Sequence, residues 1–268
     1  MGRALPTQIR ILALIATLVL VHGCKEREQL EKEAPALARA DLRVDRIAIA
    51  GVVSDVAALG DSAESRESWS VLIGNHLGRD RFGKLPIVSF SDVREILGRD
   101  DQSVMLDRFK DDGGCDEAAL AELHTVFEGK ARFIVFGNIQ EDRIEWSESE
   151  SEVVDKKTHK TTSKTKTMTT SRITSVRLRF YDLTDQQLAW DHLTVGQSSA
   201  SKEHDMTDVI EHDPKEGFLG GLVTSIVNSA IKPDPMYPPT PQLDRTLANA
   251  FDNLGDYLKP SKKKEGRR

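Results

Sequence analysis

Cysteine is scarce in this chain of 268 residues, which contains only Cys24 and Cys115. Two cysteines form one disulfide at most, so a disulfide-rich scaffold is excluded and the fold has to depend on its hydrophobic core. Apolar runs are short as well, because the run from Ile11 to Val21 falls below the about 20 residues that a membrane-spanning helix requires. With 38% hydrophobic residues, the composition suits one domain with appendages.

Signatures of catalysis are missing too. The sequence has no Walker loop, no dinucleotide fingerprint and no Gly-x-Ser-x-Gly elbow. His204 and His212 lie in an acidic stretch and could ligate a divalent ion, but their spacing matches no recognised metal motif and a solvated acidic loop is favoured. Cys115 precedes an expected helix, whose dipole could lower a thiol pKa, although no base is assigned beside it. We therefore expect no enzyme, no cofactor, no metal and no small-molecule substrate.

The N-terminus has the pattern of a secretory signal peptide. Arg3 and Arg10 supply positive charge before and at the start of the apolar run, which no acidic residue interrupts. Gly23 and Cys24 then resemble the bacterial lipobox, in which the chain is cut before the cysteine and the cysteine is acylated. Residues 1–23 are expected to be the signal peptide, with cleavage after Gly23 and lipidation of Cys24. An ordinary signal peptide followed by an accidental cysteine is the alternative.

Acyl chains on Cys24 are expected to hold the mature chain at a membrane. Lys25 stands where an aspartate would favour retention in the inner membrane, which points to the periplasmic face of the outer membrane. Residues 24–45 are charged, contain Pro35 and have no strong apolar face, so they are expected to form a tether or a loose helix. Loss of residues 1–23 changes the formal charge from −6 to −8, which argues against nucleic acid as a partner.

Alternating strand and helix patterns predict a single α/β domain over residues 46–258, followed by a basic tail at 259–268. Strands are expected at residues 46–53, 86–90, 131–137, 172–181 and 188–195. Helices are expected at residues 66–79, 92–97, 116–128 and 242–258. Ser91 is placed to cap the second helix, and Gly129 to end the third. The first and third strands are apolar on both faces, which is typical of central strands.

Several of these segments resemble envelope lipoproteins related to the curli-secretion pore. The resemblance rests on the first strand, the strand and helix from Pro86 to Leu97, the paired strands from Arg177 to Trp190 and the closing helix. The same (CsgG-like) superfamily includes the outer-membrane activators of penicillin-binding proteins (LpoB-like). The resemblance covers roughly residues 44–258 and implies a mixed-sheet α/β sandwich like an anticodon-binding domain, used for protein contacts and not for catalysis.

An insertion at about residues 140–172 distinguishes between the functions of that superfamily. A membrane-spanning strand needs alternate apolar residues over about 9 to 11 positions. Residues 141–155 hold seven acids, and 14 of the 16 residues from Lys156 to Ser171 are Lys, Thr or Ser, so no lipid-facing band exists. A long polar hairpin, with its acidic strand beside its basic strand, is favoured. A disordered loop is the alternative.

Candidate partner-binding residues lie in the insertion and in the variable segment 198–241. Trp146 is the candidate in the insertion. The stretch 217–231 is too short to span a membrane, so it is expected to pack as a surface helix or to present an apolar face to a partner or membrane. Its candidate residues are Leu219, Leu222 and Ile226.

These features predict a non-enzymatic lipoprotein that binds or assembles other proteins of the cell envelope, with a homo-oligomer left open. A subunit of a curli-type secretion channel is one alternative. A peptidoglycan-synthase activator is another, although a tether of 21 residues, at most about 70 Å long, plus a domain of roughly 45 Å falls short of a generous periplasmic crossing. An envelope hydrolase is a third and distant alternative.

Overall fold

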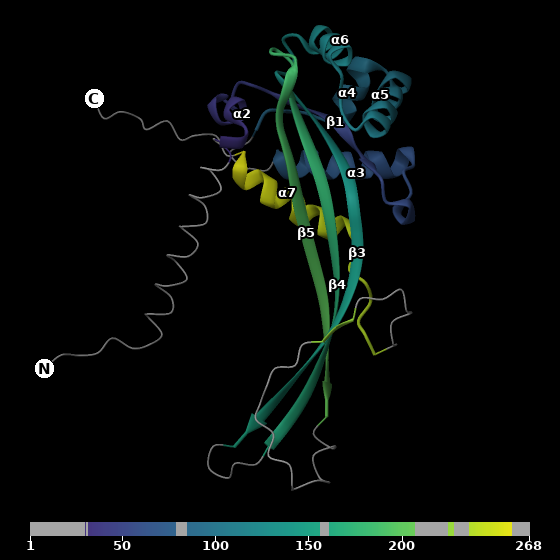
Figure 1. Cartoon of the computed structure of the whole chain (residues 1–268), viewed down its shortest axis with the longest axis vertical. Helices are drawn as coiled ribbons and strands as arrows, with labels where there is room; N and C mark the ends of the chain where they lie inside the picture. Colours follow the sequence, from purple (N-terminus) through teal and green to yellow (C-terminus); the bar gives the residue numbers. More distant parts are fainter. Residues whose placement is uncertain are drawn as a thin grey trace, which may run out of the picture. The chain divides into compact units, whose positions relative to one another are not determined.

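The structure of the chain is a computed structural model (Figure 1) that describes residues 30, 32–78, 85–155, 161–206, 225–227 and 236–258, the stretch 225–227 by its backbone alone. The chain divides into two compact units. Unit 1 comprises Met1–Ile139, Arg177–Thr194 and Phe251–Arg268, and unit 2 comprises Gln140–Val176 and Val195–Ala250.

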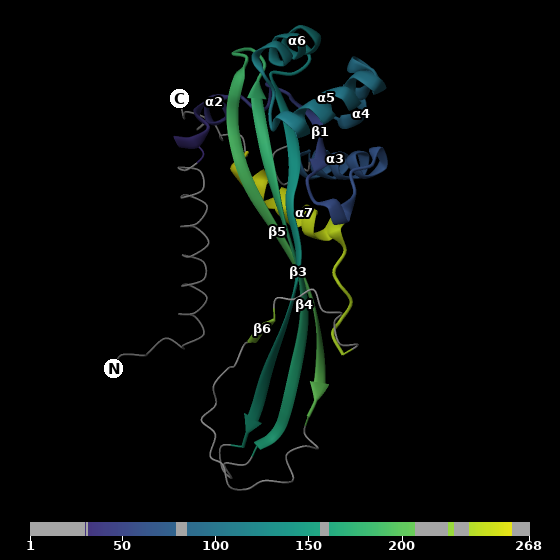
Figure 2. The ribbon, with the colours of Figure 1, turned by 45° about the vertical axis from the view of Figure 1, so that its right-hand side comes forward.

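The described elements form a mixed sheet with helices. The strands are β1 (Ile47–Ser54), β2 (Ile87–Val88), β3 (Phe133–Val154), β4 (Thr161–Asp182), β5 (Gln187–Asp205) and β6 (Ser225–Val227). The helices are α2 (Pro35–Arg39), η1 (Ala57–Leu59), α3 (Ala63–Leu77), α4 (Phe90–Leu97), α5 (Arg99–Asp112), α6 (Glu117–Phe127) and α7 (Leu243–Tyr257). The strand order is β2-β1-β3-β4-β5, and β6 pairs with β3. Figure 2 shows β3, β4 and β5 side by side. β1 is parallel to β2 and β3 while β6 is antiparallel to β3, so the predicted mixed sheet is confirmed.

Unit 1 is an α/β sandwich, because helices cover both faces of its part of the sheet. On one face, Phe109 of α5 stacks on Phe136 of β3 at 4.6 Å, and Phe136 meets Tyr181 of β4 edge-on. Successive side chains of a strand point to opposite faces. Phe180 therefore faces the other way, toward Trp190 at 5.4 Å, and Trp190 in turn lies 5.9 Å from Tyr257 of α7. The predicted sandwich architecture is thus confirmed.

A bulge interrupts β1 where it pairs with β3, between Ile49 and Gly51. The carbonyl of the extra residue, Ala50, accepts a hydrogen bond from Gln102 Nε2 of α5 at 3.3 Å. Beyond the bulge, the Val52 amide donates to Ser70 Oγ of α3 at 2.9 Å. Side chains of α3 and α5 thus satisfy backbone groups at the irregular point of the ladder.

The start of α4 differs from the sequence-based prediction. Ser89, not Ser91, is the N-cap: its Oγ accepts from the Asp92 amide at 3.2 Å, and the Asp92 carboxylate accepts from the Ser89 amide at 3.0 Å. This reciprocal capping box starts the helix at Phe90 and leaves only Ile87 and Val88 in the strand before it. The predicted cap at Ser91 was therefore wrong by two residues.

The stretch expected to form a tether contains buried apolar side chains. Leu30, Ala34, Leu37 and Leu42 are all at most 4% exposed, and Leu37 lies in α2. α5 is a further difference, because the sequence patterns predicted no helix over those residues. By contrast, α6 lies within the predicted range 116–128 and ends before Gly129 as predicted, and Asp116 is its N-cap.

In unit 2 the predicted polar hairpin is an ordered pair of strands, while residues 156–160 lie outside the described residues. β3 and β4 are antiparallel, because their contacts run in opposite directions along the two strands. Lys164 pairs with Glu150 at 3.2 Å, Lys166 with Glu148 at 2.8 Å and Arg172 with Asp142 at 2.7 Å. The acidic and the basic strand therefore lie side by side, as the sequence predicted.

Candidate interaction site

The structure describes only some of the residues that the sequence singles out. Those outside the described residues are Gly23, Cys24, His212, Leu219 and Leu222. Ile226 lies in β6, where it pairs with Ser147 of β3. Trp146 and His204 are described with their side chains.

Trp146 is half-buried in unit 2, and its buried indole nitrogen has no hydrogen-bond partner among the residues that the structure describes. Two residues further along β3, the Glu148 carboxylate accepts a hydrogen bond from the Tyr237 hydroxyl at 2.9 Å and pairs with Lys166. The hydrogen bond from Lys166, followed by that from Tyr237, holds the pKa of Glu148 below its usual range. These contacts join the 236–242 segment to the hairpin, and a partner-binding role for Trp146 stays a prediction.

His204 lies on β5, with its Nε2 3.4 Å from the backbone oxygen of Met236. Within the part of the chain that the structure describes, no three His, Cys, Asp or Glu side chains are grouped to hold a metal ion. The second weak metal candidate, His212, falls outside that part.

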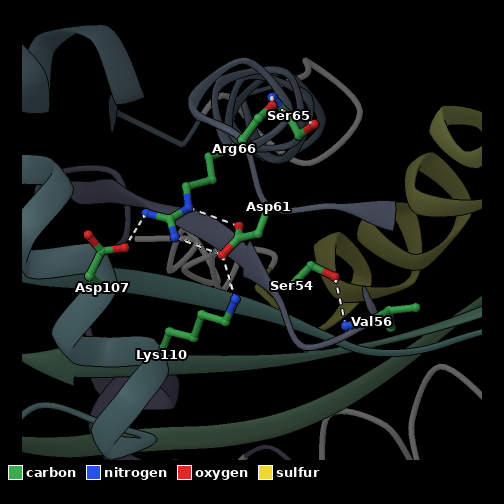
Figure 3. A network of polar contacts seen from close by, with 8 residues as sticks. Ser54, Val56, Asp61, Ser65, Arg66, Asp107 and Lys110 are labelled. Carbon is green, nitrogen blue, oxygen red and sulfur yellow. Dashed lines mark hydrogen bonds and ion pairs between the residues drawn. The ribbon is translucent and has the colours of Figure 1, made fainter. Parts of the chain in front are cut away.

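A network of charges connects α3, α5 and the loop before α3 in unit 1 (Figure 3). Asp61 accepts two hydrogen bonds from Arg66, at 2.9 and 2.7 Å, and one from Lys110 at 2.7 Å. Arg66 also pairs with Asp107 at 2.8 Å. Burial alone would raise the pKa of Asp61, but the hydrogen bonds from Arg66 and Lys110 outweigh it and lower that pKa. An ionised carboxylate that is fully engaged by two cations stabilises the fold and is a poor proton acceptor.

One concave surface of unit 1 is a small cleft between α5 and α6, with a volume of about 150 Å³. Its apolar residues include Leu97, Val104, Met105, Phe109, Ala119 and Leu123. Charged residues also line it, namely Asp101, Arg108, Asp112, Asp116 and Glu122. Val104 is 55% exposed, although it is apolar. An apolar patch surrounded by charge is the arrangement of a protein-contact surface, and the volume admits a side chain but not a typical small-molecule ligand.

Cys115 lines this cleft immediately before α6. Its backbone amide donates to the Tyr181 hydroxyl at 3.0 Å. Burial raises the pKa of the Cys115 thiol to about 12, which is opposite to the lowering that its place before a helix could produce. The thiol is therefore protonated at neutral pH and is a weak nucleophile.

The sequence alone could not identify this cleft. Three of its apolar residues, Val104, Met105 and Phe109, belong to α5, which no sequence pattern predicted. The available signal was Leu123, which the helix pattern at 116–128 places on an apolar face.

The sequence matches no family model and no curated protein. Several solved structures are similar to the chain at low identity. A PelC dodecamer from Paraburkholderia phytofirmans is 10% identical over 83% of this chain and 93% of that chain, with a TM-score of 0.35. Lipoprotein GNA1162 from Neisseria meningitidis is 13% identical over 60% of this chain and 84% of that chain, with a TM-score of 0.27. The LpoB C-terminal domain from Salmonella enterica is 8% identical over 62% of this chain and 96% of that chain, with a TM-score of 0.30.

No helix among the described residues combines the length and the apolar character needed to cross a membrane.

Proposed function

We propose that this chain is a lipid-anchored protein of the periplasmic face of the outer membrane that binds other envelope proteins without catalysing a reaction. The observation that carries the binding function is the α5–α6 cleft, where the exposed Val104 lies among charged side chains. The pattern Gly23-Cys24 after an apolar run supports the location.

The buried leucines near the N-terminus support a position close to the membrane. Leu30 is 4% exposed, and only a few residues separate it from Cys24. Because an extended chain spans at most about 3.6 Å per residue, an acyl group on Cys24 would keep Leu30 within about 22 Å of the membrane. A peptidoglycan-synthase activator has to reach enzymes in the opposite membrane. The short distance between Cys24 and Leu30 therefore favours a partner at the same membrane.

The composition of the hairpin makes a secretion-channel subunit the less favoured alternative. Lys164 and Lys166 on β4 pair with acids of β3, and the neighbouring positions of β4 are Thr or Ser. Charged side chains at such positions are costly when they face lipid.

The cleft can be tested in cells with a photo-crosslinking amino acid. We expect the probe at Val104 to give a discrete adduct with one envelope protein, and the same probe at Val71, a 40% exposed valine of α3, to give none. The substitution Met105→Asp places a charge among the apolar residues of the cleft and is expected to abolish the adduct from position 104. Adducts of equal yield from both positions, or an adduct that persists in Met105→Asp, would contradict the proposal.

A further inference from the structure

The two helices that line the α5–α6 cleft carry an excess of negative charge. Residues 99–128, which contain both helices, hold nine acidic and three basic residues. Around the cleft itself, Arg108 is basic and four residues are acidic, namely Asp101, Asp112, Asp116 and Glu122. Protein surfaces usually intersperse charges of both signs, and a surface of one sign attracts partners of the other.

Three of the four cleft acids have no cation beside them in the part of the chain that the structure describes. Asp101, Asp112 and Glu122 are exposed, and their carboxylates form no ion pair or side-chain hydrogen bond within it. The fourth, Asp116, lies 4.0 Å from Arg108. The cleft therefore presents carboxylates whose charge a ligand could neutralise.

On the side of α5 toward α3, the charges of the helix are neutralised within the chain. Asp107 of α5 pairs with Arg66 of α3 at 2.8 Å. Lys110 of α5 pairs with Asp61 at 2.7 Å. These residues already have their partners, whereas the acids of the cleft do not.

Asp112 stands at an unfavourable position for an acid. It is the last residue of α5, and Gly113 follows it in the left-handed conformation with a φ of 65°. The free carbonyl groups at the C-terminal end of a helix carry partial negative charge, which favours lysine or arginine there and disfavours aspartate. Helix stability therefore does not account for Asp112, and a cation supplied by a ligand would relieve the repulsion.

The middle of the cleft is apolar and adaptable. Val104 of α5 is 55% exposed, and Met105 beside it has an unbranched side chain that adjusts to occupants of different shape. Ala119 and Leu123 of α6 also line the cleft. A matching ligand combines an apolar group with positive charge around it.

The spacing of the cleft residues indicates the shape of that ligand. Those on α5 recur at every third or fourth position: Asp101, Val104, Met105, Arg108 and Asp112. The cleft thus follows one side of α5 from Asp101 to Asp112, a length of about 16 Å. A groove of this length between two helices is suited to the side chains of a third helix.

We propose that the α5–α6 cleft binds a basic amphipathic helix of its protein partner. One large apolar side chain of that helix enters the cleft, and lysine or arginine residues on either side of it pair with Asp101, Asp112 and Glu122. The contact is smaller than the roughly 800 Å² per partner of a stable interface, so it is weak and short-lived. This inference rests on the protein-binding function proposed above and adds the chemistry of the partner.

The test is fluorescence anisotropy of a labelled peptide, titrated with the purified full chain in nonionic detergent at low salt. The peptide is alanine-rich, about 18 residues long so that it forms a helix, and has one leucine with a lysine four positions before and after it. One comparison peptide has glutamate in place of both lysines, and another has alanine in place of the leucine. We expect both to bind at least about fivefold more weakly than the lysine peptide.

Two pairs of substitutions show whether the cleft is the binding site. Asp112→Asn with Glu122→Gln, the cleft pair, removes two charges and is expected to weaken binding about fivefold at low salt and less at high salt. Asp111→Asn with Glu117→Gln is the matched control, because both acids are exposed on the same helices but do not line the cleft. The control pair is expected to bind the peptide like the native chain.

Each outcome decides the proposal. Weaker binding in the cleft pair and not in the control pair supports it. Equal losses in both pairs would show only a general attraction by net charge, and equal binding of the lysine and glutamate peptides, or no binding of either, would exclude a basic helix. Sedimentation velocity tests a second copy of the chain as the occupant: a dimer that the cleft pair dissociates would also overturn the proposal.

The photo-crosslink from Val104 separates this inference from the proposed function. A lower adduct yield in the cleft pair than in the control pair supports a basic partner. An adduct that forms at full yield in the cleft pair would overturn the basic helix and leave the protein-binding function standing. Absence of an adduct in the native chain would instead contradict the proposed function itself.

Discussion

At the scale of single residues, the Asp61 network shows how side chains distant in sequence fix two helices of unit 1. Arg66 and Lys110 come from α3 and α5 and meet on one carboxylate that is 13% exposed. Removing one member of such a cluster leaves partly buried charges without their partner, which costs more than the pair contributes. The sequence did not indicate this cluster, because no local pattern connects Asp61 with a lysine 49 positions away.

We expect Asp61→Asn to lower the free energy of unfolding by about 1–3 kcal/mol, measured by denaturant titration at pH 7. Asp107→Asn is the matched control, because Asp107 is 56% exposed and contacts the same arginine, and it should cost less than about 1 kcal/mol.

The effect of Asp61 depends on pH in a defined direction. Its pKa is lowered in the folded state, so its stabilisation is complete above the unfolded value of about 3.9 and declines as the pH falls through the folded value. The difference between native chain and Asp61→Asn should therefore shrink below about pH 4. A difference that grows on acidification would show that the ionised carboxylate does not stabilise the fold.

At the scale of elements, α7 approaches β5 within unit 2 at a glycine. A Cβ atom on Gly196 would overlap the carbonyl oxygen of Thr246 and lie 2.9 Å from the Ala250 amide nitrogen. Asn249 Nδ2 donates to the Gln197 carbonyl at 2.7 Å beside this point. The backbones of helix and strand can come this close only because position 196 has no side chain.

Gly196→Ala is therefore expected to destabilise the chain by about 3 kcal/mol, because the helix has to move away from the strand. Gly60→Ala serves as the control: its φ of 69° disfavours a side chain, but nothing lies within 4 Å of the added carbon. That change should cost about 1 kcal/mol. Equal losses in thermal denaturation for the two variants would refute the close approach of α7 to β5.

Helices and strands could be predicted from the sequence where their apolar residues follow a regular pattern. The central strand β1 and the helix α6 were predicted, because both-face burial in the strand and the apolar stripe and Gly129 stop of the helix are local signals. α5 was missed, because its 14 residues contain only Val104, Met105, Leu106 and Phe109 as apolar residues among many charged ones. Gln102 of α5 is buried, and its side chain binds the Ala50 carbonyl at the bulge in β1. No local pattern in the sequence reveals that bulge.

The parts of the candidate site were likewise predictable only where the sequence carries a regular local pattern. The order of the hairpin was predicted because its charges are arranged in two blocks that become opposite strands. The α5–α6 cleft was not, because it needs a helix whose packing is decided by tertiary contacts. The direction of the Cys115 pKa was likewise not accessible from the sequence, since burial against Tyr181 and its neighbours outweighs the position before α6.

At the scale of the whole molecule, we propose an N-terminal lipid anchor on a chain that folds into two compact units. The exposed Val104 of the α5–α6 cleft lies in unit 1. Because Leu30 is buried and only a few residues separate it from Cys24, the proposed acylation of Cys24 would determine where the cleft can act.

The most direct measurement is mass spectrometry of the N-terminal peptide of the chain isolated from its native membranes. The account predicts a mature chain that begins at Cys24 and carries acyl chains, and it predicts that Cys115→Ala, which removes the other cysteine, leaves this modification intact. A first residue without lipid, in a chain that fractionates away from membranes, would contradict it.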